Sequence, residues 1–286
     1  MYFAKRARMR MNLQFFYRPR PKVMVVSHER SGTHFLMNSI AKCYGYRASP
    51  WVNFDNELGL NFRDPPTIAK FFGQFHGVYL ANIVKAHHSF AFFASVMEEI
   101  TSDFHIFYIY RDPRDVMVSF WKFLRKLPWD EGPKPEACNE FIRAEPCGRM
   151  IRYQQRQEKT VLHRWLTHVE GWTQGWAASC PRVTLVRFED LSFHFESVMR
   201  SFAPIFGEYP MALTRPAVHD NSILPGTGQV GTYKEYFEAS DLEYFQSIAG
   251  ACMTRLGIHG SCERVPSIAN ESSFIKDLMI GYDERR

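Results

Sequence analysis

The sequence has few cysteines, and their positions match neither a disulfide framework nor a metal centre. The six cysteines of the 286-residue chain include no Cys-x-x-Cys pair and no spacing typical of metal ligands. Scattered cysteines in a chain of this length are typical of free thiols in a reducing compartment. The chain also has no apolar run approaching about eighteen residues, so we expect no membrane span and predict a cytoplasmic protein.

Acidic residues are missing from the first 22 residues, which carry seven Lys or Arg. The net charge of the whole chain is +5, which leaves −2 for the remainder. A nucleic-acid-binding domain is expected to hold its basic excess on the folded body. We therefore predict no nucleic-acid partner and interpret residues 1–21 as a basic extension, with a membrane-touching or targeting role as the alternative. Residues 22–286 are predicted to form a single domain.

Internal repeats and low-complexity linkers are also missing, and strand-like apolar runs alternate with helical spacing instead. The predicted strands are residues 23–26, 82–85, 104–110 and 183–188, and the predicted helices are residues 33–43, 90–100, 114–126 and 241–256. This alternation predicts an α/β fold with a central parallel sheet flanked by helices. Residues 127–148 are rich in proline, glycine and charge, which indicates a lid or an acceptor-binding loop.

The chain has no Walker A motif, because Ser27 and Thr33 stand where that motif needs glycine and lysine. The first predicted strand nevertheless runs into Glu29-Arg30-Ser31-Gly32-Thr33-His34, directly before a predicted helix. Backbone N–H groups at such a turn, together with the helix dipole, form an anion site, and Gly32 lets a phosphate approach the main chain. The loop alone fits either an anion site or a plain turn.

Two further groups of polar residues follow predicted strands. Arg111 ends one strand, and Ser119 lies about two turns into the next helix. Both can reach one phosphate, although Arg111 can instead pair with Asp115. Lys85 and His87 end another strand, where a histidine suits a general base and a lysine can stabilise developing negative charge. A purely structural hydrogen bond is the alternative for His87.

Together these segments resemble the sulfotransferases that use 3′-phosphoadenosine 5′-phosphosulfate (PAPS), particularly the cytosolic type. Residues 29–35 resemble the family's 5′-phosphosulfate motif Pro-Lys-Ser-Gly-Thr-Thr-Trp, residues 109–120 its 3′-phosphate motif, and Lys85-Ala86-His87 its Lys-Thr-His. Residues 188–191 resemble Tyr-Glu-Asp-Leu, residues 228–234 resemble Gly-Val-Val-Gly-Asp-Trp-Lys, and Trp165, His168 and Trp172 also have counterparts. The resemblance spans residues 22–257 and implies a P-loop-like nucleotide-binding fold.

The resemblance implies transfer of a sulfuryl group from PAPS to a hydroxyl, or an amine, of a small-molecule acceptor. It implies His87 as the base, with Lys85 and Arg30 stabilising charge. The residues that it implies for nucleotide binding are Arg30, Ser31, Gly32, Thr33, His34, Phe35, Arg111, Ser119, Phe188, Thr227 and Gly228. No metal is implied, because fixed cations and oriented amides can supply the required electrostatics.

Several positions depart from the family pattern. Arg30 replaces the catalytic lysine and keeps the charge but not the flexible ammonium. Phe35 and Phe188 replace Trp and Tyr, which keeps the aromatic rings and loses the Tyr hydroxyl. Gly226-Thr227-Gly228 replaces Arg-Lys-Gly, so two cations are missing. We therefore expect weaker or differently placed contacts with the 3′-phosphate.

The acceptor and the oligomeric state stay open at this level. Aromatic residues in 51–75 and 127–148, among them Trp129 and Phe141, suggest an apolar or ring-bearing acceptor, or else belong to the core. The family's dimer motif keeps Lys234 and Glu243 but has Glu238-Ala239 between them, so no dimer mode is predicted.

Three other functions compete with this interpretation. The first is a kinase on a related nucleotide-binding fold, but this chain lacks the Walker lysine that such a kinase needs. A non-catalytic nucleotide-binding relative needs neither Lys85 nor His87. A nucleic-acid binder would use the basic tail and the arginine-rich residues 143–164. We expect that arginine run to be a solvated helix face or a lid over an anionic ligand.

Overall fold

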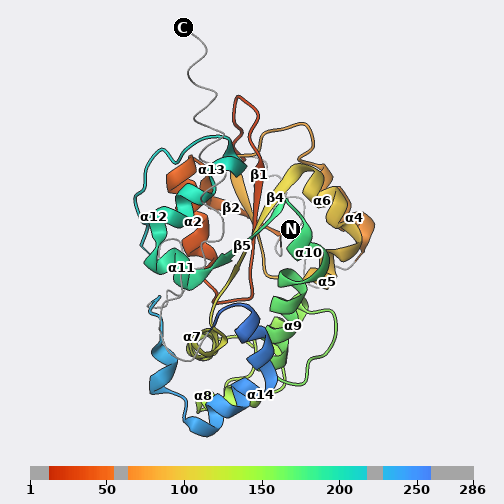
Figure 1. The fold of residues 1–286 in the computed structure, drawn as a ribbon. Helices are drawn as coiled ribbons and strands as arrows, with labels where there is room; N and C mark the ends of the chain where they lie inside the picture. Colours follow the sequence, from red (N-terminus) through yellow and green to blue (C-terminus); the bar gives the residue numbers. More distant parts are fainter. Residues whose placement is uncertain (1–12, 55–63, 218–227, 259–286) are drawn as a thin grey trace. The chain divides into compact units, whose positions relative to one another are not determined.

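The computed structural model of the chain describes residues 13–54, 64–217 and 228–258. Five parallel strands form a sheet in the order β2-β3-β1-β4-β5 (Figure 1). The strands are β1 (Lys22–Val26), β2 (Arg47–Asn53), β3 (Asn82–Ala86), β4 (Phe104–Tyr110) and β5 (Val183–Arg187). The predicted α/β fold with a central parallel sheet is confirmed.

The central strand β1 consists of apolar residues after Lys22 because helices cover both faces of the sheet. Side chains of a strand alternate between faces. Val23 and Val25 accordingly join one buried cluster, and Met24 and Val26 join the other. At its end, Val26 is paired with Ala86 of β3 and Tyr108 of β4. The segments that follow β1, β3 and β4 therefore meet at one edge of the sheet.

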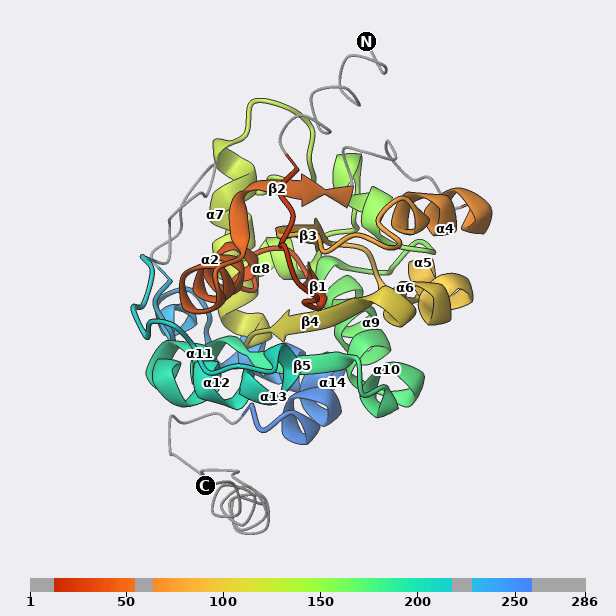
Figure 2. The same cartoon turned by 90° about the horizontal axis from the view of Figure 1, so that it is seen from above.

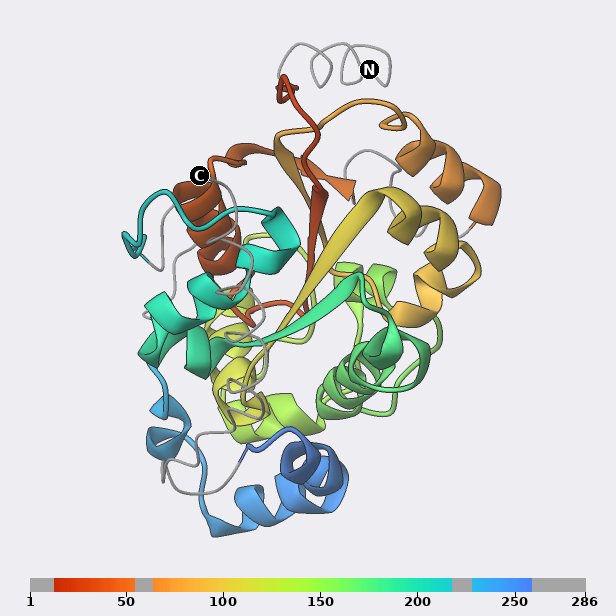
Figure 3. The same cartoon turned by 45° about the horizontal axis from the view of Figure 1, so that its top comes forward.

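Two sets of helices cover the two faces (Figures 1 and 2). One face carries α2 (Thr33–Tyr44), α11 (Phe188–Phe193), α12 (Phe195–Ser201) and α13 (Ala203–Phe206). The other carries α4 (Pro65–Gly73), α5 (Phe90–Phe93), α6 (Met97–Asp103), α9 (Val161–Thr173) and α10 (Gly175–Ser179). Figure 3 shows the same division from a third angle, with the teal and the green helices on opposite sides of the sheet.

Helix α7 (Pro113–Lys126) follows β4 and lies beyond the ends of the strands in Figure 1. Its start agrees with the sequence, because the Asp112 side chain accepts a hydrogen bond from Arg114 N and Pro113 takes the first helical position. The remaining elements are the 3₁₀ helices η1 (Ala94–Val96), η2 (Gly148–Tyr153) and η3 (Thr232–Glu235), with α8 (Cys138–Arg143) and α14 (Ala239–Arg255).

The structure differs from the predicted elements at two places. Strand β2 was not predicted, because its sequence RASPWVN is neither an apolar run nor a clean alternation. It lies at the edge of the sheet, where a proline is tolerated since one side of the strand needs no partner. The single helix predicted over residues 90–100 is divided into α5, η1 and α6.

Most of the aromatic residues considered for the acceptor site lie in the core. Phe54, Phe71, Phe72 and Phe75 are buried in the cluster that packs under α4 and α6. Within residues 127–148 the chain forms α8, whose Phe141 is fully buried and contacts Phe120 with a centroid distance of 5.8 Å. Trp129 is exposed instead. A lid role for residues 127–148 stays a prediction.

The sheet and the segments that follow β1, β3 and β4 belong to one unit, which ends at Cys252, while the described residues from Met253 to Ile258 belong to a second unit. In that unit Ile258 N donates to Met253 O at 2.8 Å. The cysteines of the described ranges are all free thiols, as predicted. Across those same ranges, the chain contains no helix with the length and apolar character needed to cross a membrane.

Candidate active site

The loop between β1 and α2 is built on two residues in the left-handed region, Arg30 with φ 66° and Gly32 with φ 100°. A Cβ at Gly32 would lie 2.4 Å from the Phe188 ring, so the loop can approach that ring only with glycine at this position. Helix α2 begins at Thr33 with no side-chain capping hydrogen bond and no acidic residue in its first turn. Its first N–H groups and the helix dipole therefore favour an anion.

Cationic side chains from three elements converge on this loop. Arg30 Nε donates a hydrogen bond to Ser119 Oγ of α7 at 3.1 Å. Burial, and then the positive charge of Arg111, lower the pKa of Arg30 to about 10. Burial, and then the charges of Lys85 and Arg30, lower the pKa of His34 to about 4. His34 is therefore neutral at pH 7, in a region of positive potential.

Arg111 is the most enclosed of these cations, with 5% of its surface exposed. Its guanidinium carbon lies 4.5 Å from the centre of the Phe188 ring, and one terminal nitrogen donates to Gln229 O at 2.6 Å. The same nitrogen is 3.6 Å from Asp115, the pairing considered from the sequence. Among the described residues, Arg111 Nε and the fully buried Ser31 Oγ have no hydrogen-bond partner. Buried donors without partners are rare in proteins, and an anionic ligand would satisfy them.

Asp115 brings the segment 228–234 to this site, a role that we did not predict. Its carboxylate accepts hydrogen bonds from Gly231 N at 2.7 Å, Thr232 Oγ1 at 3.0 Å and Tyr233 N at 3.1 Å. The carboxylate is fully buried on the first turn of α7. Only its position four residues after Arg111 distinguished it in the sequence.

His87 follows β3 and is held by the loop after β1. Its Nδ1–H donates to Ser27 O at 2.9 Å, because a carbonyl oxygen can only accept. The neutral ring therefore carries its lone pair on Nε2. Ser27 Oγ in turn lies 2.6 Å from Thr33 Oγ1 in the first turn of α2. Direct hydrogen bonds thus join His87 to the loop between β1 and α2.

A buried network behind His87 was missed by the sequence analysis. Arg164 of α9 donates to Glu29 Oε1 at 2.7 Å and to His28 Nε2 at 2.6 Å. His168, one turn later on α9, donates from Nε2 to the His87 carbonyl at 3.1 Å. Burial first, and then neighbouring positive charge, hold the pKa values of His28 and His168 well below their ordinary range. Both rings are therefore neutral.

The prediction that the arginine run lies on a solvated face is wrong for Arg164, which is 2% exposed. Its charge is compensated by Glu29, which precedes it by 135 residues. Three other members of the run also have carboxylate partners: Arg143 with Asp241, Arg152 with Glu131 and Arg156 with Glu158.

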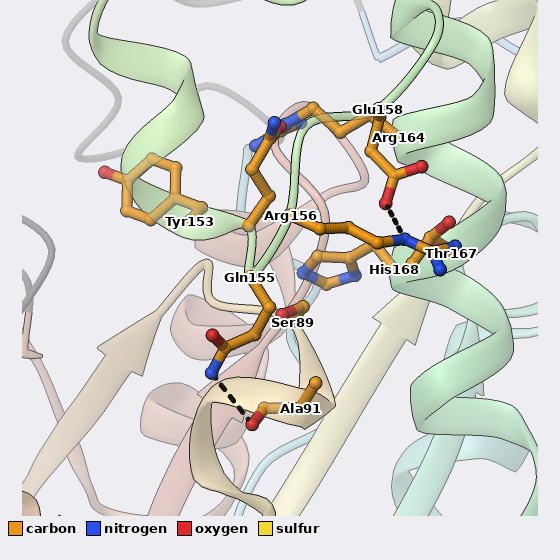
Figure 4. A pocket seen from close by; sticks show the side chains of 10 residues that line it. Ser89, Ala91, Tyr153, Gln155, Arg156, Glu158, Arg164, Thr167 and His168 are labelled. Atoms are coloured by element: carbon orange, nitrogen blue, oxygen red, sulfur yellow. Dashed lines mark hydrogen bonds and ion pairs between the residues drawn. The ribbon is translucent and has the colours of Figure 1, made fainter. Parts of the chain in front are cut away.

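A cavity of about 270 Å³ adjoins this network (Figure 4). Its walls come from residues 89–91, the segment 153–158 and helix α9. His168, which contacts the His87 carbonyl, lines it. Tyr153 also lines it and meets the His87 ring with a centroid distance of 5.6 Å. Figure 4 shows the Arg156 side chain extended toward Glu158, its ion-pair partner at 3.0 Å.

The remaining predicted residues have different surroundings. Phe35 and Phe188 are each 1% exposed and belong to the core cluster under α2, so their predicted contact with a nucleotide stays a prediction. Gly228 begins the segment held by Asp115, and Thr227 lies outside the described residues. Within the described ranges, no group of three or more His, Cys, Asp or Glu residues is placed to hold a metal ion.

The sequence model of the sulfotransferase domain matches residues 20–212, about two thirds of the chain. The chain belongs to the sulfotransferase family. The crystal structure of mouse sulfotransferase SULT7A1 complexed with PAP superimposes with a TM-score of 0.58 at 17% identity, covering 83% of this chain and 88% of that chain. At this identity the likeness shows a common fold. A comparison with curated protein sequences finds no match. In this sulfotransferase, all of the strands and the converging residues 27–34, 85–87, 111 and 119 lie within the matched domain.

Proposed function

We propose that this sulfotransferase transfers a sulfuryl group from PAPS to a hydroxyl of a small-molecule acceptor. The observation that carries the proposal is the convergence of Arg30, Arg111 and Ser119 on an uncapped helix start, with His87 hydrogen-bonded to the same loop. PAPS offers two separated phosphates and a sulfonate, which fits a site with several cationic side chains. The PAP in the mouse SULT7A1 structure supports the same class of donor.

The 5′-phosphosulfate is proposed to lie at the start of α2, where residues 31–34 offer backbone N–H groups, together with the Ser31 hydroxyl. The 3′-phosphate is proposed to meet Arg111 and Ser119. Ser119 Oγ accepts its hydrogen bond from Arg30, so its own O–H is left to donate to a phosphate oxygen. Gly228 and Thr227 are proposed to complete this side, and Phe35 and Phe188 to support the nucleotide.

In the proposed reaction, the acceptor oxygen attacks sulfur while the acceptor proton passes to His87 Nε2. The new O–S bond forms as the bond from sulfur to the bridging oxygen breaks, and its electron pair leaves with adenosine 3′,5′-bisphosphate. Arg30 and Lys85 stabilise the negative charge that develops on the leaving group. The Ser27 carbonyl stabilises the imidazolium through the Nδ1–H bond.

Three measurements test the proposal. PAP binding by calorimetry should be tight, and ATP with magnesium should bind far more weakly; the reverse order would favour the kinase. Incubation with sulfur-labelled PAPS and a metabolite extract should label an acceptor.

His87→Ala should bind PAP normally and lose transfer by at least about a hundredfold, as removal of a general base does. Parent-like transfer by this variant would remove the base from the scheme.

A further inference from the structure

Glu29 is a buried carboxylate in the loop that holds His87. It occupies the position of the proline that begins the resembling motif. We propose that Glu29 is a positioning residue for His87: the negative charge of Glu29 stabilises the imidazolium that forms when His87 takes the acceptor proton, and Arg164 keeps Glu29 ionised for this role. The inference rests on the proposed function for its purpose, but not for its measurement.

The geometry ties the three groups together. The loop residue Ser27 binds His87 Nδ1, and Glu29 follows two residues later in the same loop. Helix α9 holds the other side, because His168 binds the His87 carbonyl and Arg164 binds Glu29. The Glu29–Arg164 pair therefore joins the two elements that orient His87.

The charge of Glu29 acts on His87 directly. Burial acts to raise the pKa of Glu29, but Arg164, and then His87 in its charged form, outweigh it and lower that pKa. Glu29 therefore stays ionised near neutral pH. Its Oε1 accepts from Arg164, whereas Oε2 has no hydrogen-bond partner among the described residues. Because an electrostatic interaction is mutual, the attraction that keeps Glu29 ionised also favours protonated His87.

The other groups around this pair modulate its effect. Arg164 and Arg152 carry positive charge and also interact with Glu29. Lys85 lies on β3, two residues before His87, and the Tyr153 ring packs against the His87 ring. The neutral rings of His28 and His168 complete the surroundings. Arg164 keeps Glu29 ionised, and Glu29 supplies the negative charge, so removing the charge of Glu29 should lower the pKa of His87.

The test is a titration of His87 in the unliganded protein by NMR of the imidazole Cε1–H signals, with His87→Ala identifying the signal. We expect Glu29→Gln to lower the pKa of His87 by about one unit, as loss of a nearby negative charge does, and Glu29→Asp, which keeps the charge, to leave it near the parent value. Gln at position 29 can still accept a hydrogen bond from Arg164. Asp103→Asn is the matched control. Asp103 pairs with Lys22 where β1 and β4 begin, at the edge of the sheet opposite to His87, so its loss should leave the pKa of His87 unchanged.

Transfer assays give the second readout. The acidic limb of the kcat/KM profile should move to lower pH in Glu29→Gln, with a plateau reduced about three- to tenfold because a weaker base accepts the proton. In Glu29→Asp the limb should stay near its parent position. An unmoved His87 pKa in Glu29→Gln would overturn the inference. If Glu29→Gln does not fold, a His87 pKa in Glu29→Asp about one unit below the parent value would overturn it. The NMR titration needs no PAPS, so failure of the proposed function is seen separately.

Discussion

Replacing Gly32 by alanine tests the central geometric feature of the site. Gly32 has φ 100°, a conformation that costs an L-residue about 1–2 kcal/mol. An added Cβ would also lie 2.4 Å from one carbon of the Phe188 ring and 2.9 Å from the next. The ring cannot easily withdraw, because it is buried against Phe35 and Arg111 covers it. Overpacking of this kind costs about 1–3 kcal/mol, so Gly32→Ala should destabilise the fold by about 2–5 kcal/mol.

Gly77 provides a matched control. It also has a positive φ, 74°, but a Cβ there would meet no atom within 4 Å. Gly77→Ala should therefore be destabilised only by the conformational cost of the positive φ, about 1–2 kcal/mol. Urea unfolding of both variants measures the difference. PAP affinity should fall about tenfold or more in Gly32→Ala, because displacement of Phe188 moves Arg111 away from its proposed hydrogen bond with the 3′-phosphate of PAP. It should be unchanged in Gly77→Ala.

A double variant separates the clash from the backbone conformation. Phe188→Leu removes ring atoms at the point of contact, so Gly32→Ala should cost less in that background than in the parent. The reasoning is refuted if Gly32→Ala proves no more destabilising than Gly77→Ala, or if Phe188→Leu leaves its cost unchanged.

Three other outcomes follow from the same structure. His28 and His168 have lowered pKa values in the folded state, so below about pH 6.5 the unfolded state binds more protons than the folded state. The free energy of unfolding should therefore fall on acidification below that pH by up to about 1.4 kcal/mol per pH unit for each histidine. Urea titrations at several pH values measure this change. Arg111→Met should weaken PAP binding by about tenfold or more in calorimetry, and it should also lower the transition temperature, because the hydrogen bond to Gln229 O and the pairing with buried Asp115 are lost. Asp115→Asn keeps one acceptor for three donors, and should destabilise the protein by about 1–3 kcal/mol and expose residues 228–234 to limited proteolysis.

The parts of the fold that follow local rules were predictable. Strands β1 and β4 are near-continuous apolar runs, because central parallel strands are covered on both faces. The start of α7 was readable from Asp112 and Pro113, since capping depends on residues adjacent in sequence. The eight-residue interval from Arg111 to Ser119 predicts that both can reach one phosphate, because helical spacing is regular.

Other features depend on partners that are distant in sequence. Edge strand β2 contains Pro50 and few apolar residues, and it is a strand because its backbone pairs with β3. Arg164 resembles any arginine of an amphipathic helix until the fold brings Glu29 next to it. Phe35 and Phe188 are buried by packing against the sheet, which their sequence positions did not indicate, and their contact with a nucleotide stays a prediction.

The sequence by itself determined the family, the parallel sheet and the set of residues that gather at its edge, because each of these is written in motifs and periodicities only a few residues long. Only the tertiary structure decided which charges are compensated, which donors remain without partners and what holds His87. Those properties are set by distances between separate elements, and burial makes the charges and hydrogen bonds at such distances far stronger than they are in water.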